Sequence, residues 1–409
     1  MIKRFNLFGS AKFAALALAV TVVSGCSVFS DDDEPTFAEL QPIDSKVSPR
    51  VVWDSSVGDG VGDYFSRLNP VISDGVVYAA DRAGIVAAFN QQNGKRLWRV
   101  DVRKLLRDED TSSWSWNPFS SDLPIRLSGG LATQYNRVYV GSENGDVIAL
   151  NAADGQLAWH TEVGNEVLAD PAVGEGRVVV HTGAGKVISL NADNGEKQWE
   201  FVQEVPALSL RGSSAPTIAA GGAIVGTNSG KATVLILENG QQAWEQRIGQ
   251  ATGASELERL IDVDAEPVVV GQTAYFISYN GQLAALELTS GRVIWQREYS
   301  SYQDFTIAGN RIYVTDSNSH VYALERSSGT EVWSSTELWG RNLTAPAVVG
   351  DYVVVGDFEG YFHWLNRDTG VLEGRLDLGG DGAYVGARVA DGNLFIQTRD
   401  GSVVSVTQE

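Results

Sequence analysis

Residues that could perform acid–base, nucleophilic or metal chemistry are few in this sequence. Its 409 residues include four histidines and one cysteine. The histidines fall at unrelated positions, and none has another His or Cys at metal-ligand spacing: they are His160, His181, His320 and His363. No Gly-x-Ser-x-Gly elbow, phosphate loop or dinucleotide fingerprint is present. The sequence therefore predicts no catalytic residue, no metal site and no cofactor, and it favours a binding protein over an enzyme.

The single cysteine, Cys26, has a context that predicts covalent modification. A basic start is followed by the apolar run Phe13 to Val23 and by the small-residue ending "VSGC". This order is typical of a secretory signal peptide rather than a membrane-spanning helix, and its ending resembles the bacterial lipobox. We expect residues 1–25 to be removed and Cys26 to carry acyl chains, including palmitate, which would form a permanent membrane anchor. Ser27 stands where an Asp would resemble an inner-membrane retention signal, so we expect the outer membrane, on its periplasmic face.

The residues after Cys26 are polar and acidic. Residues 26–49 include the run Asp31 to Glu34 but show no apolar period, so we interpret them as a flexible tether. Four adjacent carboxylates are more often solvated than metal-bound. The formal net charge of −20 makes nucleic acid and anionic lipid surfaces poor partners.

The rest of the chain, residues 50–409, is an internal repeat. Each unit has a Gly and, fourteen positions later, a Trp, as in "GDVIALNAADGQLAW", with alternating apolar residues and a two-residue turn between them. Units of about 40 to 50 residues with four short antiparallel strands indicate a β-propeller. The clearest Gly and Trp pairs are Gly84 and Trp98, Gly145 and Trp159, Gly185 and Trp199, Gly230 and Trp244, and Gly281 and Trp295. Two more units keep the spacing with one member changed, Ser319 with Trp333 and Gly360 with Gly374.

The two ends of the repeat region complete each other. An eighth unit begins near Gly401, but the sequence reaches Glu409 before the position of its Trp, while Trp53 has no unit before it. We therefore predict an all-β, eight-bladed propeller whose ring is closed by the strand containing Trp53, which completes the last blade. The recurring tryptophans are expected to dock neighbouring blades rather than to mark a site: Trp53, Trp98, Trp159, Trp199, Trp244, Trp295 and Trp333.

Functional residues are expected where the unit length varies. The longest connections run from Trp98 to Gly145 and from Trp244 to Gly281, and all such connections should lie on one face of the ring. The segment "LSLRG" places Leu208, Leu210 and Arg211 in one connection, and "DVD" places Asp262 and Asp264 in the next. An apolar centre with Arg and a charged rim has the composition of a protein-binding hot spot, although turn and cap chemistry also explains the two aspartates.

Another insertion, Arg107 to Pro124, contains three aromatic residues. They are Trp114, Trp116 and Phe119, and they are as compatible with a loop folded on its own small cluster as with a binding surface. We interpret this segment as a variable loop without an assigned role.

Two resemblances follow from these motifs. The unit text "A-L-N-x-x-x-G-x-x-x-W" resembles the tryptophan-docking motif of quinoprotein dehydrogenases, which implies a blade type. Enzymes of that kind commonly carry a vicinal disulfide, which a chain with one cysteine cannot form. A quinone- or small-molecule-binding propeller enzyme is therefore the alternative interpretation.

The loop motifs carry a closer resemblance. "WDSSVGDGVGDYFSRLNP", "LSLRGSSAPT" and "IDVDAEPVVV" are similar to the BamB family, lipoproteins of the outer-membrane β-barrel assembly machinery. The resemblance implies a non-enzymatic scaffold that binds the POTRA domains of BamA and assists insertion of outer-membrane proteins, with unfolded clients as possible further partners. It also implies that Leu208, Leu210, Arg211, Asp262 and Asp264 are the residues that dock onto BamA.

Overall fold

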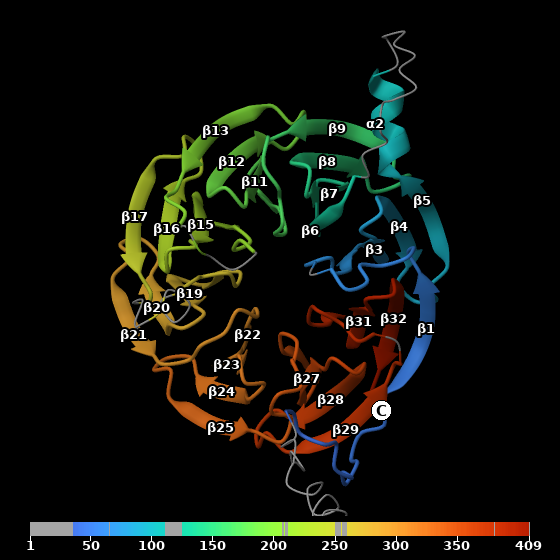
Figure 1. The fold of residues 1–409 in the computed structure, drawn as a ribbon, viewed down its shortest axis with the longest axis vertical. Coiled ribbons are helices and arrows are strands. Elements are labelled where there is room, and N and C mark those ends of the chain that lie inside the picture. The colour runs from blue at the N-terminus through green and yellow to red at the C-terminus, as the bar shows by residue number, and fades with distance from the viewer. Residues whose placement is uncertain are drawn as a thin grey trace, which may run out of the picture.

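The chain forms a ring of eight four-stranded antiparallel sheets around a central axis (Figure 1). The structure, a computed structural model, describes residues 36–64, 66–110, 125–206, 208, 212–249, 255, 260–379 and 381–408. Hydrophobic clusters fill the space between neighbouring sheets, so each blade buries its faces against the blades beside it. The predicted eight-bladed β-propeller is confirmed.

The blades follow the chain, with the innermost strand first and the outermost last. The first four blades are β2 (Val71–Ser73), β3 (Val76–Ala80), β4 (Ile85–Asn90) and β5 (Arg96–Asp101); β6 (Leu127–Gln134), β7 (Arg137–Ser142), β8 (Asp146–Asn151) and β9 (Leu157–Glu162); β10 (Ala172–Gly174), β11 (Arg177–His181), β12 (Lys186–Asn191) and β13 (Lys197–Val202); and β14 (Thr217–Ala219), β15 (Gly222–Gly226), β16 (Lys231–Ile236) and β17 (Gln242–Arg247).

The remaining blades repeat this order, except that the eighth takes its outermost strand from the start of the repeat region. They are β18 (Val268–Val270), β19 (Thr273–Ile277), β20 (Leu283–Glu287) and β21 (Val293–Arg297); β22 (Thr306–Ala308), β23 (Arg311–Thr315), β24 (Val321–Glu325) and β25 (Glu331–Ser335); β26 (Ala347–Val349), β27 (Tyr352–Gly356), β28 (Tyr361–Asn366) and β29 (Leu372–Asp377); and β30 (Arg388–Ala390), β31 (Asn393–Gln397), β32 (Ser402–Thr407) and β1 (Arg50–Ser56).

Ring closure depends on the pairing of β1 with β32. The two strands run antiparallel from the pair Arg50 and Thr407 to the pair Ser56 and Ser402, with an irregularity beside Trp53. Figure 1 shows this junction as a blue strand beside a red one. Because the last sheet has strands from distant parts of the sequence, opening the ring requires breaking a full strand pair.

Each motif tryptophan docks on the turn between the third and fourth strands of the next blade. Trp159 Nε1 donates a hydrogen bond to the Ala192 carbonyl at 3.0 Å. Its ring covers Gly195, where a Cβ would lie 2.6 Å from the indole and φ is +74°. Glycine is required there for both reasons. The same indole-to-carbonyl bond is made by Trp53, Trp98, Trp199, Trp244, Trp295 and Trp333.

The seventh blade has Gly374 at the motif position, and residues from the N-terminal segment occupy the vacated space. A Cβ on Gly374 would lie 2.4 Å from Val47 Cγ1, and Val47 is buried in the cluster shared by the last two blades. Both Lys46 N and Val47 N donate to the Glu373 carbonyl, at 2.8 and 3.2 Å. A tryptophan here would have no turn to cover, because the eighth blade is completed by β1 instead of continuing from β32.

Residues 36–49, which we call the strap, therefore pack against the ring. The expectation of a flexible tether as far as residue 49 does not hold for the strap. The Ala38 N–H donates to the Trp339 carbonyl at 2.9 Å, and the Ala38 carbonyl accepts from Arg341 Nη1 at 2.9 Å. Arg341 is buried, with Nε 2.7 Å from Asp357 Oδ2. In Figure 1 the strap is the blue segment beside β29. The strap could not be predicted from the sequence, because irregular chain that docks on a distant blade has no periodic signal.

Within the described parts of the chain, one helix interrupts the all-β pattern. The chain continues from β5 into α2 (Val102–Asp110), where the sequence analysis expected only a variable loop from Arg107 onward. Val102, Leu105 and Leu106 lie on one face, at helical spacing, and pack against the cluster between the first two blades. Asp101 Oδ1 accepts a hydrogen bond from the Arg103 N–H at 3.1 Å, as an N-cap residue does. Trp114, Trp116 and Phe119 lie outside the described residues.

Candidate docking surface

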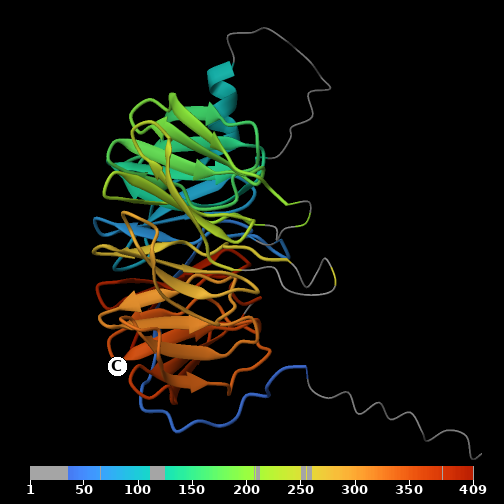
Figure 2. The same ribbon diagram turned by 90° about the vertical axis from the view of Figure 1, so that its left-hand side faces the viewer.

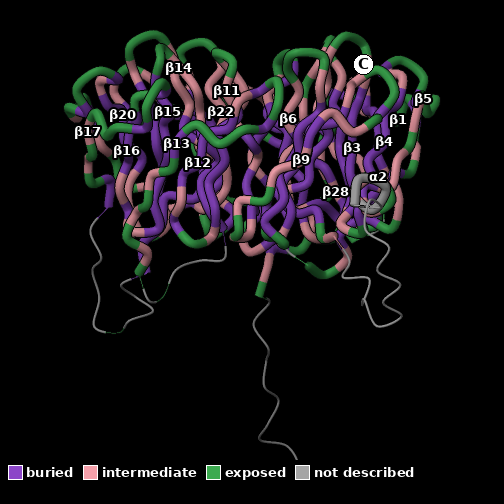
Figure 3. Tube along the Cα trace, turned by 90° about the horizontal axis from the view of Figure 1, so that it is seen from above, coloured by how far each residue is buried: buried purple, intermediate pink, exposed green. Residues whose placement is uncertain are grey.

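The connections that carry the predicted binding residues lie on one face of the ring. In Figure 2 the described chain on either side of residues 207–211 and 250–259, coloured yellow-green and yellow, lies at the right-hand face, whereas the C-terminus lies at the left-hand face. Figure 3 shows exposed turns on both faces and buried strands between them. This face follows from topology, because each connection joins the end of an outermost strand to the start of the next innermost strand.

The two predicted segments lie side by side. A Cβ on Gly212 would be 3.2 Å from both carboxylate oxygens of Asp264, so the chain directly after Arg211 contacts this side chain. Ser214 Oγ donates to the Ala265 carbonyl at 2.9 Å and joins the same two connections. Residues 52 positions apart in sequence are thereby held in one surface region.

The two aspartates are buried rather than displayed. Asp262 is 0% exposed and Asp264 is 4% exposed. The Asp262 carbonyl accepts from the Tyr279 N–H at 2.8 Å, which fixes its segment to the turn after β19. Burial raises the pKa of Asp264 to about 6, a rise that nearby Asp304 reinforces and Arg67 opposes. Their side chains can therefore shape the surface, but direct contact with a partner would need the loop to move.

Leu208 differs from the aspartates in being exposed. It is 49% exposed, a large value for an apolar side chain. Leu210 and Arg211 lie outside the described residues, as does Cys26. The structure thus brings Gly212, beside Arg211, against Asp264.

Arg67 connects the docking connections to the centre of the ring, which the sequence analysis did not foresee. Its Nη2 donates to the Asp264 carbonyl at 2.9 Å, and its Nη1 lies 3.5 Å from Asp304 Oδ1. Asp304 Oδ1 also accepts from the Glu266 N–H at 2.8 Å. Across the ring, Arg388 Nη2 lies 3.2 Å from Asp170 Oδ2.

A central cavity of about 370 Å³ is lined by five of these charged residues, which are Arg67, Asp170, Glu266, Asp304 and Arg388. Burial, reinforced by Asp304 and Asp170, raises the pKa of Glu266 to about 8. Burial likewise raises the pKa of Asp170 to about 6, although Arg388 opposes the rise. The sequence marks these cavity residues only weakly. Asp170 and Glu266 each stand directly before the Pro of a "P-A-V" or "P-V" strand, and they share no other pattern.

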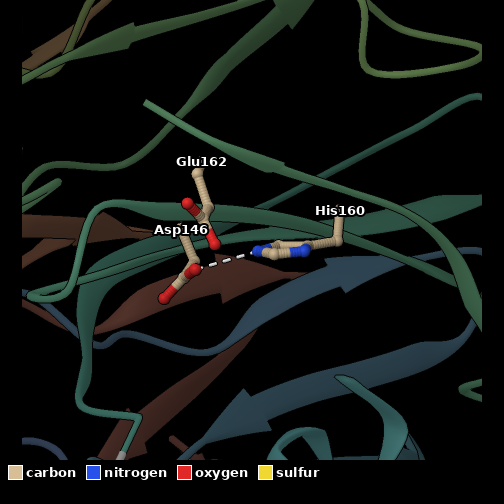
Figure 4. A group of neighbouring side chains, drawn as sticks. All are labelled: Asp146, His160 and Glu162. Carbon is tan, nitrogen blue, oxygen red and sulfur yellow. Dashed lines mark hydrogen bonds and ion pairs between the residues drawn. The ribbon is translucent and has the colours of Figure 1, made fainter. Parts of the chain in front are cut away.

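One cluster of metal-ligating side chains appears among the described residues, although the sequence predicted no metal site. Asp146, His160 and Glu162 each offer a ligand atom, and these atoms lie within 4.8 Å of one another (Figure 4). This group has no His or Cys pair at ligand spacing, because His160 meets two carboxylates and the three side chains come together across a β-hairpin. Among the described residues, no helix is long and apolar enough to cross a membrane.

Comparisons with known proteins agree with the loop motifs. The family model described as outer membrane protein assembly factor BamB matches residues 14–111 and 82–335. Outer membrane protein assembly factor BamB of Yersinia pestis is 43% identical over 392 residues, which cover 96% of this chain and 97% of the relative.

Solved structures give the same result. The crystal structure of BamB from Moraxella catarrhalis superposes with a TM-score of 0.75 at 26% identity and covers 88% of this chain and 100% of that chain. Quinohemoprotein alcohol dehydrogenase from Comamonas testosteroni has a TM-score of 0.65 at 14% identity, covering 88% of this chain and 76% of that one, a similarity of fold alone. With its eight closed blades and its match to a relative along nearly its whole length, the chain belongs to the BamB family of outer membrane protein assembly factors.

Proposed function

We propose that this protein is a non-enzymatic scaffold of the outer-membrane β-barrel assembly machinery that binds the POTRA domains of BamA. The contact between Gly212 and Asp264 supports the proposal most directly, because it joins the two family motifs into one surface region. By docking there, the ring would help to position BamA and incoming barrel precursors.

Because the two aspartates are buried, the residues of this surface have two different roles. Leu208, Leu210 and Arg211 supply the contacts with the partner, because an apolar anchor and an Arg are typical of binding hot spots. Asp262 and Asp264 hold the shape of the surface from beneath, since both are buried. Loss of either carboxylate would then weaken binding indirectly.

The strap supports an anchoring role for Cys26. Residues 26–35 join the lipid-bearing cysteine to the strap, and ten residues span at most about 35 Å. The strap is fixed to the seventh blade through Val47, Ala38 and Arg341. A lipidated Cys26 would therefore hold the ring close to the periplasmic face of the outer membrane.

Unfolded outer-membrane proteins are a second class of partner in this proposal. The outermost strand of each blade has an unpaired edge in the described sheets, as the sheet orders show. Such edges can pair with an extended client through backbone hydrogen bonds. Client binding would require no further side-chain chemistry.

The test is affinity purification of the full chain from detergent-solubilised outer membranes, followed by identification of the partners. We expect BamA to co-purify, and we expect Cys26→Ser to leave the protein soluble or uncleaved. Absorption spectra of the purified protein, with and without calcium, test the alternative that the protein is a quinone-binding propeller enzyme. A bound quinone together with an absence of BamA would reject the scaffold in favour of a quinoprotein.

A further inference from the structure

The second blade has an unusual set of side chains across its outer hairpin. Asp146 begins β8, and His160 and Glu162 lie in β9. His160 Nε2 is 2.8 Å from Asp146 Oδ1, and Figure 4 shows the Glu162 carboxylate directed toward the same space. One ligand atom from each of the three lies within 4.8 Å of the others.

The next two blades use the same positions for ordinary ion pairs. In the third blade Lys186 Nζ lies 3.1 Å from Glu200 Oε1, and in the fourth Lys231 Nζ lies 2.7 Å from Glu245 Oε1. Those positions, one residue after the turn glycine and one after the motif tryptophan, correspond to Asp146 and His160. The second blade thus replaces the lysine by a carboxylate.

A second carboxylate faces the first directly. Asp146 and Glu162 are Cα partners in the antiparallel register of β8 and β9. Like charges directly opposite each other destabilise a sheet. A bound cation would offset this repulsion, whereas the Lys–Glu pairs of the next two blades have no such need.

Asp146 is held in a fixed orientation by its neighbours. Ser142 Oγ donates to Asp146 Oδ2 at 2.7 Å and itself accepts from the Asp146 N–H at 2.9 Å. Metal sites depend on this kind of support, in which an outer hydrogen bond orients an ionised ligand.

We propose that Asp146, His160 and Glu162 form a binding site for a zinc ion. One imidazole nitrogen and two carboxylate oxygens are ligands suited to Zn²⁺, and water would complete a tetrahedral set. The side chains of Asp146 and His160 are 12% and 20% exposed, and Glu162 is exposed, so an ion can enter from solvent. Neutral His160 would bind zinc through its Nε2 lone pair while its one proton stands on Nδ1, and a doubly protonated His160 would release one proton to solvent.

The measurement is zinc binding to the full chain, purified without a histidine tag and stripped with chelator. Titration against a chromophoric chelator gives stoichiometry and affinity, and the melting temperature gives a second readout because a ligand that binds only the folded state raises it. We expect one zinc per chain and a zinc-dependent rise in melting temperature. Calcium and magnesium at equal concentration should not displace zinc, because imidazole is not their ligand.

His160→Gln and Glu162→Gln should each weaken binding by about tenfold or more, and both should lose the zinc-dependent rise. The matched control is His320→Gln. His320 Nδ1 lies 3.3 Å from Asp316 Oδ2 but belongs to no group of three ligands among the described residues. This control should bind zinc as the parent does.

Two outcomes would overturn the proposal. One is the absence of a stoichiometric zinc ion in the parent chain. The other is zinc binding that survives His160→Gln unchanged, which would assign the ion to another group, such as the acidic run at residues 31–34. Circular dichroism of each variant shows whether the propeller has folded, and Glu162→Gln tests the site even if His160→Gln does not fold.

Discussion

Val47 fills the space beside Gly374, the one motif position of blades one to seven that lacks a tryptophan. A Cβ on Gly374 would meet Val47 Cγ1 at 2.4 Å. The N-terminal segment is therefore part of the ring's packing. It completes the junction between the last two blades, where the usual tryptophan would have no turn to cover.

Gly374→Ala is expected to destabilise the full chain by about 1–3 kcal/mol, the usual cost of overpacking a filled core site. Gly374 has no positive φ, so the backbone itself accepts an alanine. In a chain without residues 27–49 the same change should cost little, because Val47 is gone. Denaturant titration of the four proteins gives the coupling, and equal costs in both backgrounds would show that Val47 does not occupy this space.

Trp199→Ala should lower the free energy of unfolding by about 3–5 kcal/mol, the cost of emptying a large aromatic site. Trp199 is buried, covers Gly240 and donates to the Leu237 carbonyl at 2.8 Å. The control is Trp339→Ala, because Trp339 is 41% exposed and lies outside the motif. We expect about 1 kcal/mol or less for the control, and a larger loss at Trp339 than at Trp199 would reverse the assigned roles.

Glu266 is expected to make stability fall as pH rises. Its pKa is about 8 in the folded protein and about 4.3 in an unfolded chain. The folded state therefore binds more protons between these values, and the ionisation penalty is complete only above pH 8. Glu266→Gln cannot ionise, so it should be the more stable protein at pH 8.5, by more than about 1 kcal/mol given 1.4 kcal/mol per pKa unit.

Thermal unfolding at pH 5 and pH 8.5 checks this expectation. Near pH 5 the parent and Glu266→Gln should differ little, because Glu266 is then protonated in the fold. Glu196→Gln is the control, since Glu196 lies in an exposed turn. A difference between parent and Glu266→Gln that did not grow with pH would contradict the raised pKa.

The sequence predicted those parts of the fold that repeat. Glycine turns, alternating strands and Trp53 were sufficient for eight blades and for closure by β1, because each blade is specified by local residues and contacts with its neighbours. The strap was missed because Val47 docks on Gly374, far away in sequence. The helix α2 was missed because two turns of apolar spacing at Val102, Leu105 and Leu106 are too short to stand out.

The candidate docking surface was predicted only in outline. The sequence indicated that the segments "LSLRG" and "DVD" lie on neighbouring connections. It did not reveal that Asp262 and Asp264 are buried, because burial depends on packing against β15, β19 and Arg67. The cluster of Asp146, His160 and Glu162 was missed for a related reason, since its members become neighbours only in the register of β8 and β9.

The central claim is tested most directly by titrating the purified POTRA domains of BamA with the parent chain, Arg211→Ala and the double variant Leu208→Ala with Leu210→Ala. Loss of a hot-spot residue costs about 2 kcal/mol or more, roughly thirtyfold in affinity. Leu97→Ala is the control, because Leu97 is exposed on β5, away from this surface. We predict that both test variants lose at least this much affinity at unchanged melting temperature, while the control binds normally. POTRA binding that is equally tight for all four proteins would contradict the proposed docking surface.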